Sequence, residues 1–146
     1  MVQRILSRAR DRLVIAEARA LIKDAAELLL RPHTNLLVVC DCGVMVGVVT
    51  KTDIVSQVSR HPLGPGFMAP LEAIMTRDVA SCGAEDSLPD VWQMMKARNV
   101  QRVPVLDTAH RPIGVIYARD ALQGLLGEVE TEDELLREYI AGVGYR

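Results

Sequence analysis

Aromatic residues are scarce in this chain, which has one Trp, three Tyr and one Phe among its 146 residues. A bound ligand therefore finds few rings on which to stack, and its affinity depends on backbone hydrogen bonds and aliphatic contacts. We expect such binding to be modest, in the micromolar range of about −8 kcal/mol or weaker.

An excess of positive charge is also missing, because 17 Lys and Arg face 19 Asp and Glu and the formal net charge is −2. Binding to nucleic acid or to a membrane surface depends on concentrated positive charge, so the composition argues against both partners. The longest uncharged run, residues 61–71, is short and interrupted by Pro and Gly, and the Arg-rich start has no secretory pattern. We expect a soluble, cytoplasmic protein.

The sequence has little that could carry catalysis or hold a metal. Its three cysteines are too few for a disulfide framework, and Cys40 and Cys42 are too close for an ordinary bridge across an extended segment. None of the three histidines stands at a recognised ligand spacing from them. A P-loop, a nucleophile elbow and a zinc motif are missing. We therefore expect no metal, no required cofactor and no enzyme activity.

What the sequence does have is an internal repeat. The segment GVVTKTD at residues 47–53 returns 67 residues later as GVIYARD at 114–120. The same offset matches 35–39 with 102–106, and an offset of 69 matches 5–8 with 74–77. A unit this short buries little apolar surface by itself, so the repeat predicts two copies packed face to face.

Each copy has the pattern of a β-α-β-β-α unit, which predicts an α+β fold. In the second copy, residues 86–90 combine a cap, a first-turn Pro and an acidic N3 position, and apolar residues then recur at helical spacing. The strands predicted in this copy are 79–82, 102–106 and 112–117, and its last helix is 119–126. The first copy has predicted strands at 13–15, 36–40 and 44–49 and predicted helices at 19–31 and 51–59.

The predicted organisation has four parts. They are a first repeat over 1–60, a linker over 61–71, a second repeat over 72–127 and an acidic amphipathic helix over 128–146. The acidic helix contrasts in charge with the Arg-rich start. The sequence leaves two interpretations open: the termini meet, within or between subunits, or both are solvated charged surfaces.

Two aspartates at matching positions are the main functional candidates. Asp53 and Asp120 each follow a buried strand and fall in the first turn of a predicted helix. Helix N-terminal amides attract phosphate, and a carboxylate beside them can accept both hydroxyls of a ribose. Thr50 can add a hydroxyl to the same ligand, and Lys51 or Arg119 can neutralise phosphate charge.

The same positions also fit helix capping, which needs no ligand. Thr50 and Asp53 have the spacing of a capping box. The second copy keeps the aspartate but has Tyr117 in place of the capping threonine, and Tyr is no short-side-chain cap. An aspartate kept without its cap partner favours ligand binding.

The order and repetition of these features resemble a pair of CBS domains, the cystathionine-β-synthase-type module. The resemblance rests on IMTRDV at 74–79, VQRVPV at 100–105 and the Gly-Val-x-x-x-x-Asp pattern in both copies, and it covers roughly 2–126. It implies two units packed sheet to sheet about a pseudo-two-fold axis, and a homodimer. It also implies a regulatory sensor that binds AMP, ADP, ATP or S-adenosylmethionine in two clefts.

The resemblance implies roles for particular residues. Asp53 and Asp120 correspond to the family's ribose-binding aspartate, and Thr50 to the hydroxyl three positions earlier. Arg102 corresponds to a frequent phosphate contact, and Thr76 is a weaker polar candidate. The remaining candidates surround the adenine or are plain core, and they are Ile15, Leu36, Val79, Ser81, Val103 and Pro104.

Two positions depart from the family pattern. Tyr117 stands where Ser or Thr is usual, and Asn35 stands where the second copy has Arg102. We therefore expect each cleft to lack one polar contact.

Two hypotheses follow from the sequence. The first is a stand-alone module that binds an adenosine-containing ligand between its repeats and signals to a separate target protein by conformational change. The alternative is an interaction or oligomerisation protein with vestigial clefts, whose acidic C-terminal helix is the working surface.

Overall fold

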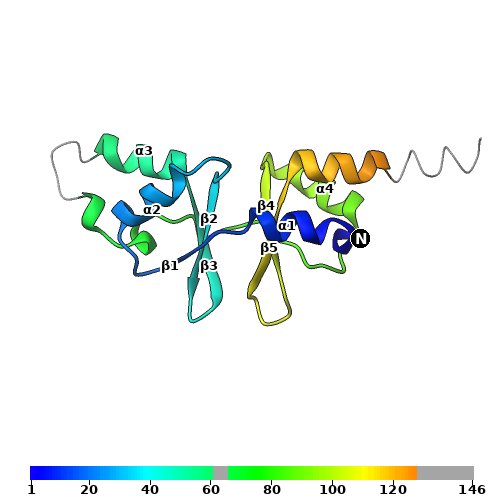
Figure 1. Ribbon diagram of the computed structural model, residues 1–146, viewed down its shortest axis with the longest axis horizontal. Coiled ribbons are helices and arrows are strands. Elements are labelled where there is room, and N and C mark those ends of the chain that lie inside the picture. Colours follow the sequence, from blue (N-terminus) through cyan, green and yellow to red (C-terminus); the bar gives the residue numbers. More distant parts are fainter. Residues whose placement is uncertain (61–65, 128–146) are drawn as a thin grey trace, which may run out of the picture.

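Two β-sheets face each other at the centre of the computed structural model, which describes residues 1–60 and 66–127 (Figure 1). The first unit contains β1 (Ile15–Glu17), α2 (Ile22–Leu29), β2 (Leu36–Asp41), β3 (Val44–Thr50) and α3 (Lys51–Arg60). Its sheet has the order β1-β2-β3, with β1 parallel and β3 antiparallel to β2. The second unit contains α4 (Leu88–Arg98), antiparallel strands β4 (Arg102–Leu106) and β5 (Pro112–Tyr117), and a helix over 118–127. Helices cover the outer side of each sheet.

The α+β class is confirmed, and several elements have the predicted bounds. β4 and β5 begin and end where the sequence predicted. The hydroxyl of Ser87 caps α4 by accepting the N–H of Asp90 at 3.4 Å, and Pro89 lies in the first turn. Asn99 ends this helix in the left-handed conformation, with φ of 52°.

The predicted strand over 79–82 is wrong. Only Cys82 pairs with the sheet, through an isolated parallel bridge to Val105. Just before this segment, Thr76 instead exchanges two backbone hydrogen bonds with Val48 of the first unit, at 2.9 and 3.0 Å. The chain is still crossing from one unit to the other here, so it reaches the second sheet only at Cys82.

Two bounds in the first unit are also later than predicted. The first strand begins at Ile15 instead of residue 13, and the first long helix begins at Ile22 instead of residue 19. The chain turns at residues 18–20 before that helix, and the N–H of Ala20 donates to the carbonyl of Glu17 at 3.0 Å. Residues 18–20 therefore form a turn, and the helix begins only after it.

A shared core lies between the two sheets, which confirms sheet-to-sheet packing. Its buried members come from all four central strands and are Leu36, Val38, Cys40, Met45, Val48, Leu106, Val115 and Tyr117. Apolar burial of this kind stabilises by roughly 25 cal/mol per Å². Each unit alone would expose this apolar face to water, so we expect the two repeats to unfold together as one folding body.

The segment that leads into each unit packs against the opposite unit. Helix α1 (Leu6–Arg12) precedes β1 but lies beside β5 of the second unit (Figure 1), and Val2 and Ala9 belong to the second unit's core. Conversely, Leu71 and Met75 precede the second unit but belong to the first unit's core. This exchange ties the two units together beyond their shared core.

The repeated glycine of the two copies makes room for these crossings. A Cβ on Gly47 would lie 2.7 Å from the carbonyl oxygen of Thr76, and one on Gly114 would lie 2.9 Å from the carbonyl carbon of Ala9. Real Cβ atoms do not approach so closely. Gly47 and Gly114 are therefore required because another backbone crosses the strand at each position.

Leu71, predicted as the last residue of the linker, is a core residue. Its side chain is fully buried, and its N–H donates to the carbonyl of Ala20 at 2.9 Å. Residues 61–65 of the predicted linker and the predicted acidic helix over 128–146 lie outside the described residues. No helix in the described ranges is long and apolar enough to cross a membrane.

Candidate ligand-binding cleft

One cleft between the two units brings together residues from both repeats. We call it the Thr50 cleft, and it has a volume of about 200 Å³. The first unit and the crossing segment contribute Leu36, Val48, Thr50, Thr76, Asp78, Val79 and Ala80, and the second unit contributes Arg98, Val100, Gln101, Arg102 and Pro104. A ligand in this cleft would contact both repeats at once.

Asp53 stands beside this cleft in the first turn of α3. Its Oδ2 accepts the backbone N–H of Thr50 at 2.9 Å and the hydroxyl of Thr50 at 3.3 Å. These bonds fix the carboxylate next to a residue that lines the cleft. Within the described residues, Oδ1 of Asp53 has no hydrogen-bond partner, so the capping role leaves one carboxylate oxygen for a ligand.

Arginines lie on the second-unit side of the cleft. The Nε of Arg102 is buried and has no hydrogen-bond partner among the residues that the structure describes. A buried donor left without a partner costs roughly 1–3 kcal/mol, so such a group favours a ligand oxygen nearby. Arg98 also lines the cleft, and its Nη2 lies 3.4 Å from Oδ2 of Asp78 in an exposed ion pair.

The matching position in the second repeat has a different structure. Arg12 donates from Nε to Oδ2 of Asp120 at 3.2 Å and from Nη2 to Oδ1 at 3.5 Å. The guanidinium of Arg12 also lies over the ring of Tyr117, 4.5 Å from its centroid. The hydroxyl of Tyr117 points to the carbonyl of His33 at 3.5 Å. We call this cluster of Arg12, His33, Tyr117 and Asp120 the Tyr117 site.

Seven of the predicted site residues meet at the Thr50 cleft. Six of them line it, and Asp53 stands next to it; the six are Leu36, Thr50, Thr76, Val79, Arg102 and Pro104. The expectation that each cleft lacks one polar contact is wrong, because Thr50 and Arg102 line the same cleft. Thr50 comes from the end of β3 and Arg102 from the start of β4, so the Thr50 cleft combines the last strand of one repeat with the middle strand of the other.

The other predicted site residues lie elsewhere. Asp120 belongs to the Tyr117 site, and Arg119 is exposed with its guanidinium 5.6 Å from the Tyr117 ring. Val103 is fully buried in the second unit's core. The remaining three are Lys51 on the exposed side of α3, Ile15 on the edge strand β1, and Ser81 in a hollow at the start of α4.

Several lining residues were not predicted as site residues. They are Val48, Asp78, Arg98, Val100 and Gln101, while Ala80 lies between the predicted residues Val79 and Ser81. Val100 and Gln101 immediately precede Arg102, and Asp78 precedes Val79. Their position next to predicted site residues in the sequence could have identified these three. Arg98 could not be found in this way, because it reaches the cleft from the last turn of α4.

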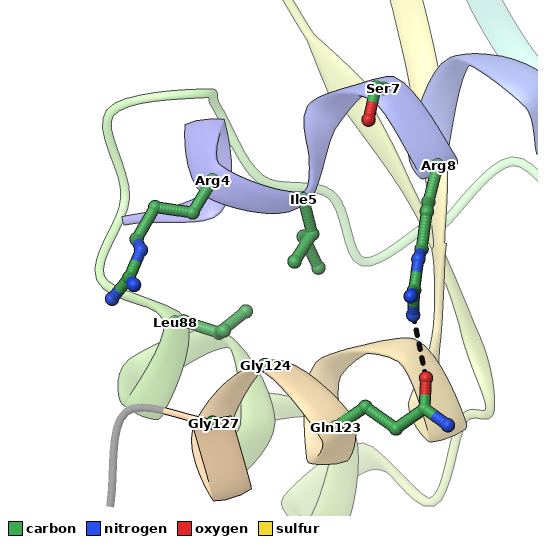
Figure 2. Close-up of a pocket in the computed structure, with 8 residues that line it drawn as sticks. All are labelled: Arg4, Ile5, Ser7, Arg8, Leu88, Gln123, Gly124 and Gly127. Carbon is green, nitrogen blue, oxygen red and sulfur yellow. Dashed lines mark hydrogen bonds between the residues drawn. The ribbon is translucent and has the colours of Figure 1, made fainter. Parts of the chain in front are cut away.

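A second hollow, of about 370 Å³, lies within the second unit and away from the Thr50 cleft (Figure 2). It is bordered by the N-terminal helices, α4 and the helix over 118–127. Arg8 extends across one side of it and donates to Oε1 of Gln123 at 2.6 Å. Ile5 and Leu88 form its apolar wall. This hollow has no carboxylate among its described lining residues and brings together none of the predicted site residues.

Two of the three cysteines, Cys40 and Cys82, are buried, and Cys42 is exposed. Burial and, to a smaller extent, the nearby charge of Asp86 together raise the pKa of Cys82 to about 12. Burial likewise raises the pKa of Cys40. Both thiols stay protonated at neutral pH. Among the residues that the structure describes, no three His, Cys, Asp or Glu side chains come together as a metal site.

Known proteins share both the sequence pattern and the fold. A homoserine O-acetyltransferase of Methanosphaera stadtmanae is 31% identical over 123 residues, which are 80% of this chain and 24% of that protein. An L-aspartate semialdehyde sulfurtransferase of Methanocaldococcus jannaschii is 28% identical over 108 residues, which are 73% of this chain and 20% of that protein. This chain therefore spans about a fifth to a quarter of the length of these relatives.

Solved structures match nearly the whole described fold. The CBS-domain containing protein ATU1752 from Agrobacterium tumefaciens is 25% identical with a TM-score of 0.71, over 84% of this chain and 97% of that one. The CBS domain pair of protein MJ0100, in complex with 5′-methylthioadenosine and S-adenosyl-L-methionine, is 26% identical with a TM-score of 0.67, over 82% of this chain and 96% of that one. The family model of the CBS domain matches residues 2–60 and again 71–127. The chain thus belongs to the CBS-domain family and carries a tandem pair of these domains.

Proposed function

We propose that this protein is a regulatory module that binds an adenosine-containing ligand in the Thr50 cleft. The observation that carries the proposal is the convergence of Asp53 and Thr50 from one repeat with Arg102 from the other on one cleft. The likeness to a CBS pair that was solved with 5′-methylthioadenosine and S-adenosyl-L-methionine supports this class of ligand. AMP, ADP, ATP and S-adenosylmethionine are the candidates.

The cleft has groups suited to each part of such a ligand. The free Oδ1 of Asp53 can accept a ribose hydroxyl, which gives a charge-assisted hydrogen bond. Aliphatic side chains such as Leu36, Val79 and Pro104 offer a wall for the base. Arg102 and Arg98 offer positive charge to a phosphate or carboxylate. At about 200 Å³, the cleft is smaller than the pockets of about 300–1,000 Å³ that enclose drug-sized ligands, so the polar tail of the ligand extends past the rim.

A ligand in this cleft acts as a regulator by joining the two repeats. It binds the arrangement in which both walls are in place more tightly than any other arrangement, and it shifts the population accordingly. The change is read by a separate target protein or by an attached domain. The relatives named as enzymes match over only about a fifth to a quarter of their length, and we propose that this pair regulates and does not catalyse. A cytoplasmic location stays a prediction.

The proposal predicts that Asp53→Ala weakens ligand binding. Loss of a hydrogen bond to a charged group costs about 1.5–3 kcal/mol, which corresponds to roughly 10- to 150-fold in Kd. Calorimetric titration of the wild type and the variant with S-adenosylmethionine and with AMP measures the change. Asp24→Ala is the matched control, because Asp24 also lies in the first turn of a helix but is exposed and outside the cleft. Unchanged binding in Asp53→Ala would refute the assignment.

We also propose that the protein is a homodimer that uses α3 and the helix over 118–127. Both helices lie along the same edge of the molecule (Figure 1). Val55 and Leu122 occupy matching positions of the two repeats and are 62% and 42% exposed. Such exposed apolar residues at symmetric positions suit a two-fold interface between copies.

This proposal predicts that Leu122→Glu shifts the protein from dimer to monomer, because the charge would be buried in an apolar contact. Light scattering coupled to size-exclusion chromatography measures the mass. Leu30→Glu is the control, since Leu30 is 83% exposed and lies at the end of α2. A variant that stays dimeric would exclude this surface.

The alternative function is an interaction protein with vestigial clefts. The engaged carboxylate of Asp120 favours it, because the Tyr117 site already uses both oxygens of its aspartate within the chain. This alternative predicts that a folded dimer binds none of the adenosine ligands. Ligand binding that depends on Asp53 would exclude it.

A further inference from the structure

Two of the differences between the matching sites replace a small side chain by a large one. At the 67-residue offset, Arg12 takes the position of Val79, and Tyr117 takes the position of Thr50. Both Val79 and Thr50 line the Thr50 cleft. The second site therefore has two large side chains where the first has two small ones.

These two side chains use the groups that a ligand would need. Arg12 engages both oxygens of Asp120, which are the atoms that correspond to the ribose-binding carboxylate. Its guanidinium lies 4.5 Å from the centroid of the Tyr117 ring, and the guanidinium of Arg102 lies 5.3 Å from the same centroid. Arginine over an aromatic face is an attractive arrangement. The side chain of Asp120 is only 7% exposed and that of Arg12 only 21%.

The helix that carries Arg12 is held in place by a second arginine. Arg8, one turn earlier in α1, donates to Gln123 at 2.6 Å (Figure 2). Its Nη1 also lies 3.9 Å from Oδ1 of Asp120. Arg8 and Arg12 therefore both bind side chains of the helix over 118–127. Arg12, Tyr117 and Asp120 do not border the Thr50 cleft, the hollow between Arg8 and Leu88, or the two hollows at Lys51 and at Ser81.

We propose that Arg12 and Tyr117 close the second site and that each chain therefore binds a single adenosine-containing ligand, in the Thr50 cleft. This inference rests on the proposed function, and it assigns the choice of cleft to these two residues. In the second site, Arg12 occupies the Asp120 oxygens that a ribose diol would otherwise contact. Tyr117 fills the space there that corresponds to the space left open beside the smaller Thr50 in the first cleft. The asymmetry of the repeat sets the stoichiometry at one.

The test exchanges residues between the two sites. The double variant Arg12→Val with Tyr117→Thr gives the second site the side chains of the first at these two positions, while Asn35 still stands in the position of Arg102. In titrations with S-adenosylmethionine and with AMP, we expect the number of sites per chain to rise from one in the wild type to two in this variant. The reverse exchange, Thr50→Tyr with Val79→Arg, closes the remaining cleft and reduces the number to zero. Thermal unfolding verifies that each variant is folded, and the reverse exchange tests the inference even if the first variant fails to fold.

The outcomes separate this inference from the proposed function. A wild type with two sites per chain would overturn the inference and leave the proposed function intact. One site in the wild type and still one in the folded Arg12→Val, Tyr117→Thr variant would also overturn it. A wild type without binding would refute the proposed function, and binding that appears only in this variant would then still support closure by Arg12 and Tyr117. Absence of binding in both proteins would overturn both proposals.

Discussion

Leu71→Ala is expected to lower the free energy of unfolding by about 2–5 kcal/mol, the range for truncation of a fully buried leucine. Leu71 is fully buried in the first unit's core, although it precedes the second unit in the chain. Its truncation leaves a cavity and weakens the crossing that ties the units together. Chemical denaturation followed by circular dichroism measures the loss.

Leu30→Ala is the control for this variant. Leu30 is 83% exposed at the end of α2, so its truncation removes little buried surface and changes stability by less than about 0.5 kcal/mol. Equal effects of the two substitutions would contradict the assignment of Leu71 to the core. A loss in two separate transitions would contradict the description of the pair as one folding body.

Gly114→Ala is expected to lower the free energy of unfolding by about 1–3 kcal/mol, the usual cost of overpacking a close contact. The new methyl group would lie 2.8 Å from Cβ and 2.9 Å from the carbonyl carbon of Ala9. Neither atom is at the end of a flexible side chain, so α1 has to move away from β5. Because α1 carries Arg12, we also expect this movement to loosen the contact with Asp120.

Gly83→Ala is the matched control, because its Cβ would approach no atom closer than the carbonyl oxygen of Leu106, at 3.8 Å. That distance is an ordinary van der Waals contact, and we expect a change within about 0.5 kcal/mol. A stability of Gly114→Ala equal to that of Gly83→Ala would show that α1 does not need the glycine.

Much of the fold could be predicted because the signals are local. The apolar run at 102–106, the turn residues after it and the Ser87 cap each determine structure within a few residues, and all three elements formed as predicted. The repeat added the expectation of two packed sheets. The strand predicted over 79–82 was wrong because the chain is still crossing between the units there: Thr76, just before it, pairs with Val48 of the other unit, and no local pattern reports that pairing.

The candidate site could be predicted only in part, for a related reason. The sequence identified Thr50, Asp53 and Arg102 but could not group them, since the cleft joins the end of β3 to the start of β4. It also singled out Tyr117 as unusual. The partner of Asp120 could not be found, because Arg12 is one of several arginines near the start of the chain and only the packing of α1 on the opposite unit brings the two together.

The role of the repeated glycine could likewise not be predicted from the sequence. Sequence comparison of the two copies detected Gly47 and Gly114 as a shared feature, but gave them no role. Their role follows from the structure, in which Thr76 closely approaches Gly47 and Ala9 closely approaches Gly114. The matched segments 74–77 and 5–8 lie at these two crossings, since Met75 and Thr76 approach Gly47 and residues 5–8 lead to Ala9, which approaches Gly114.

A crystal structure of this protein with bound S-adenosylmethionine tests the assignment of the Thr50 cleft most directly. We predict a single ligand per chain, with its ribose at Asp53, its base against Leu36 and Val79, and its charged tail toward Arg102. We also predict that Arg12 remains on Asp120. A ligand bound at the Tyr117 site, or in the hollow between Arg8 and Leu88, would contradict the assignment of the Thr50 cleft.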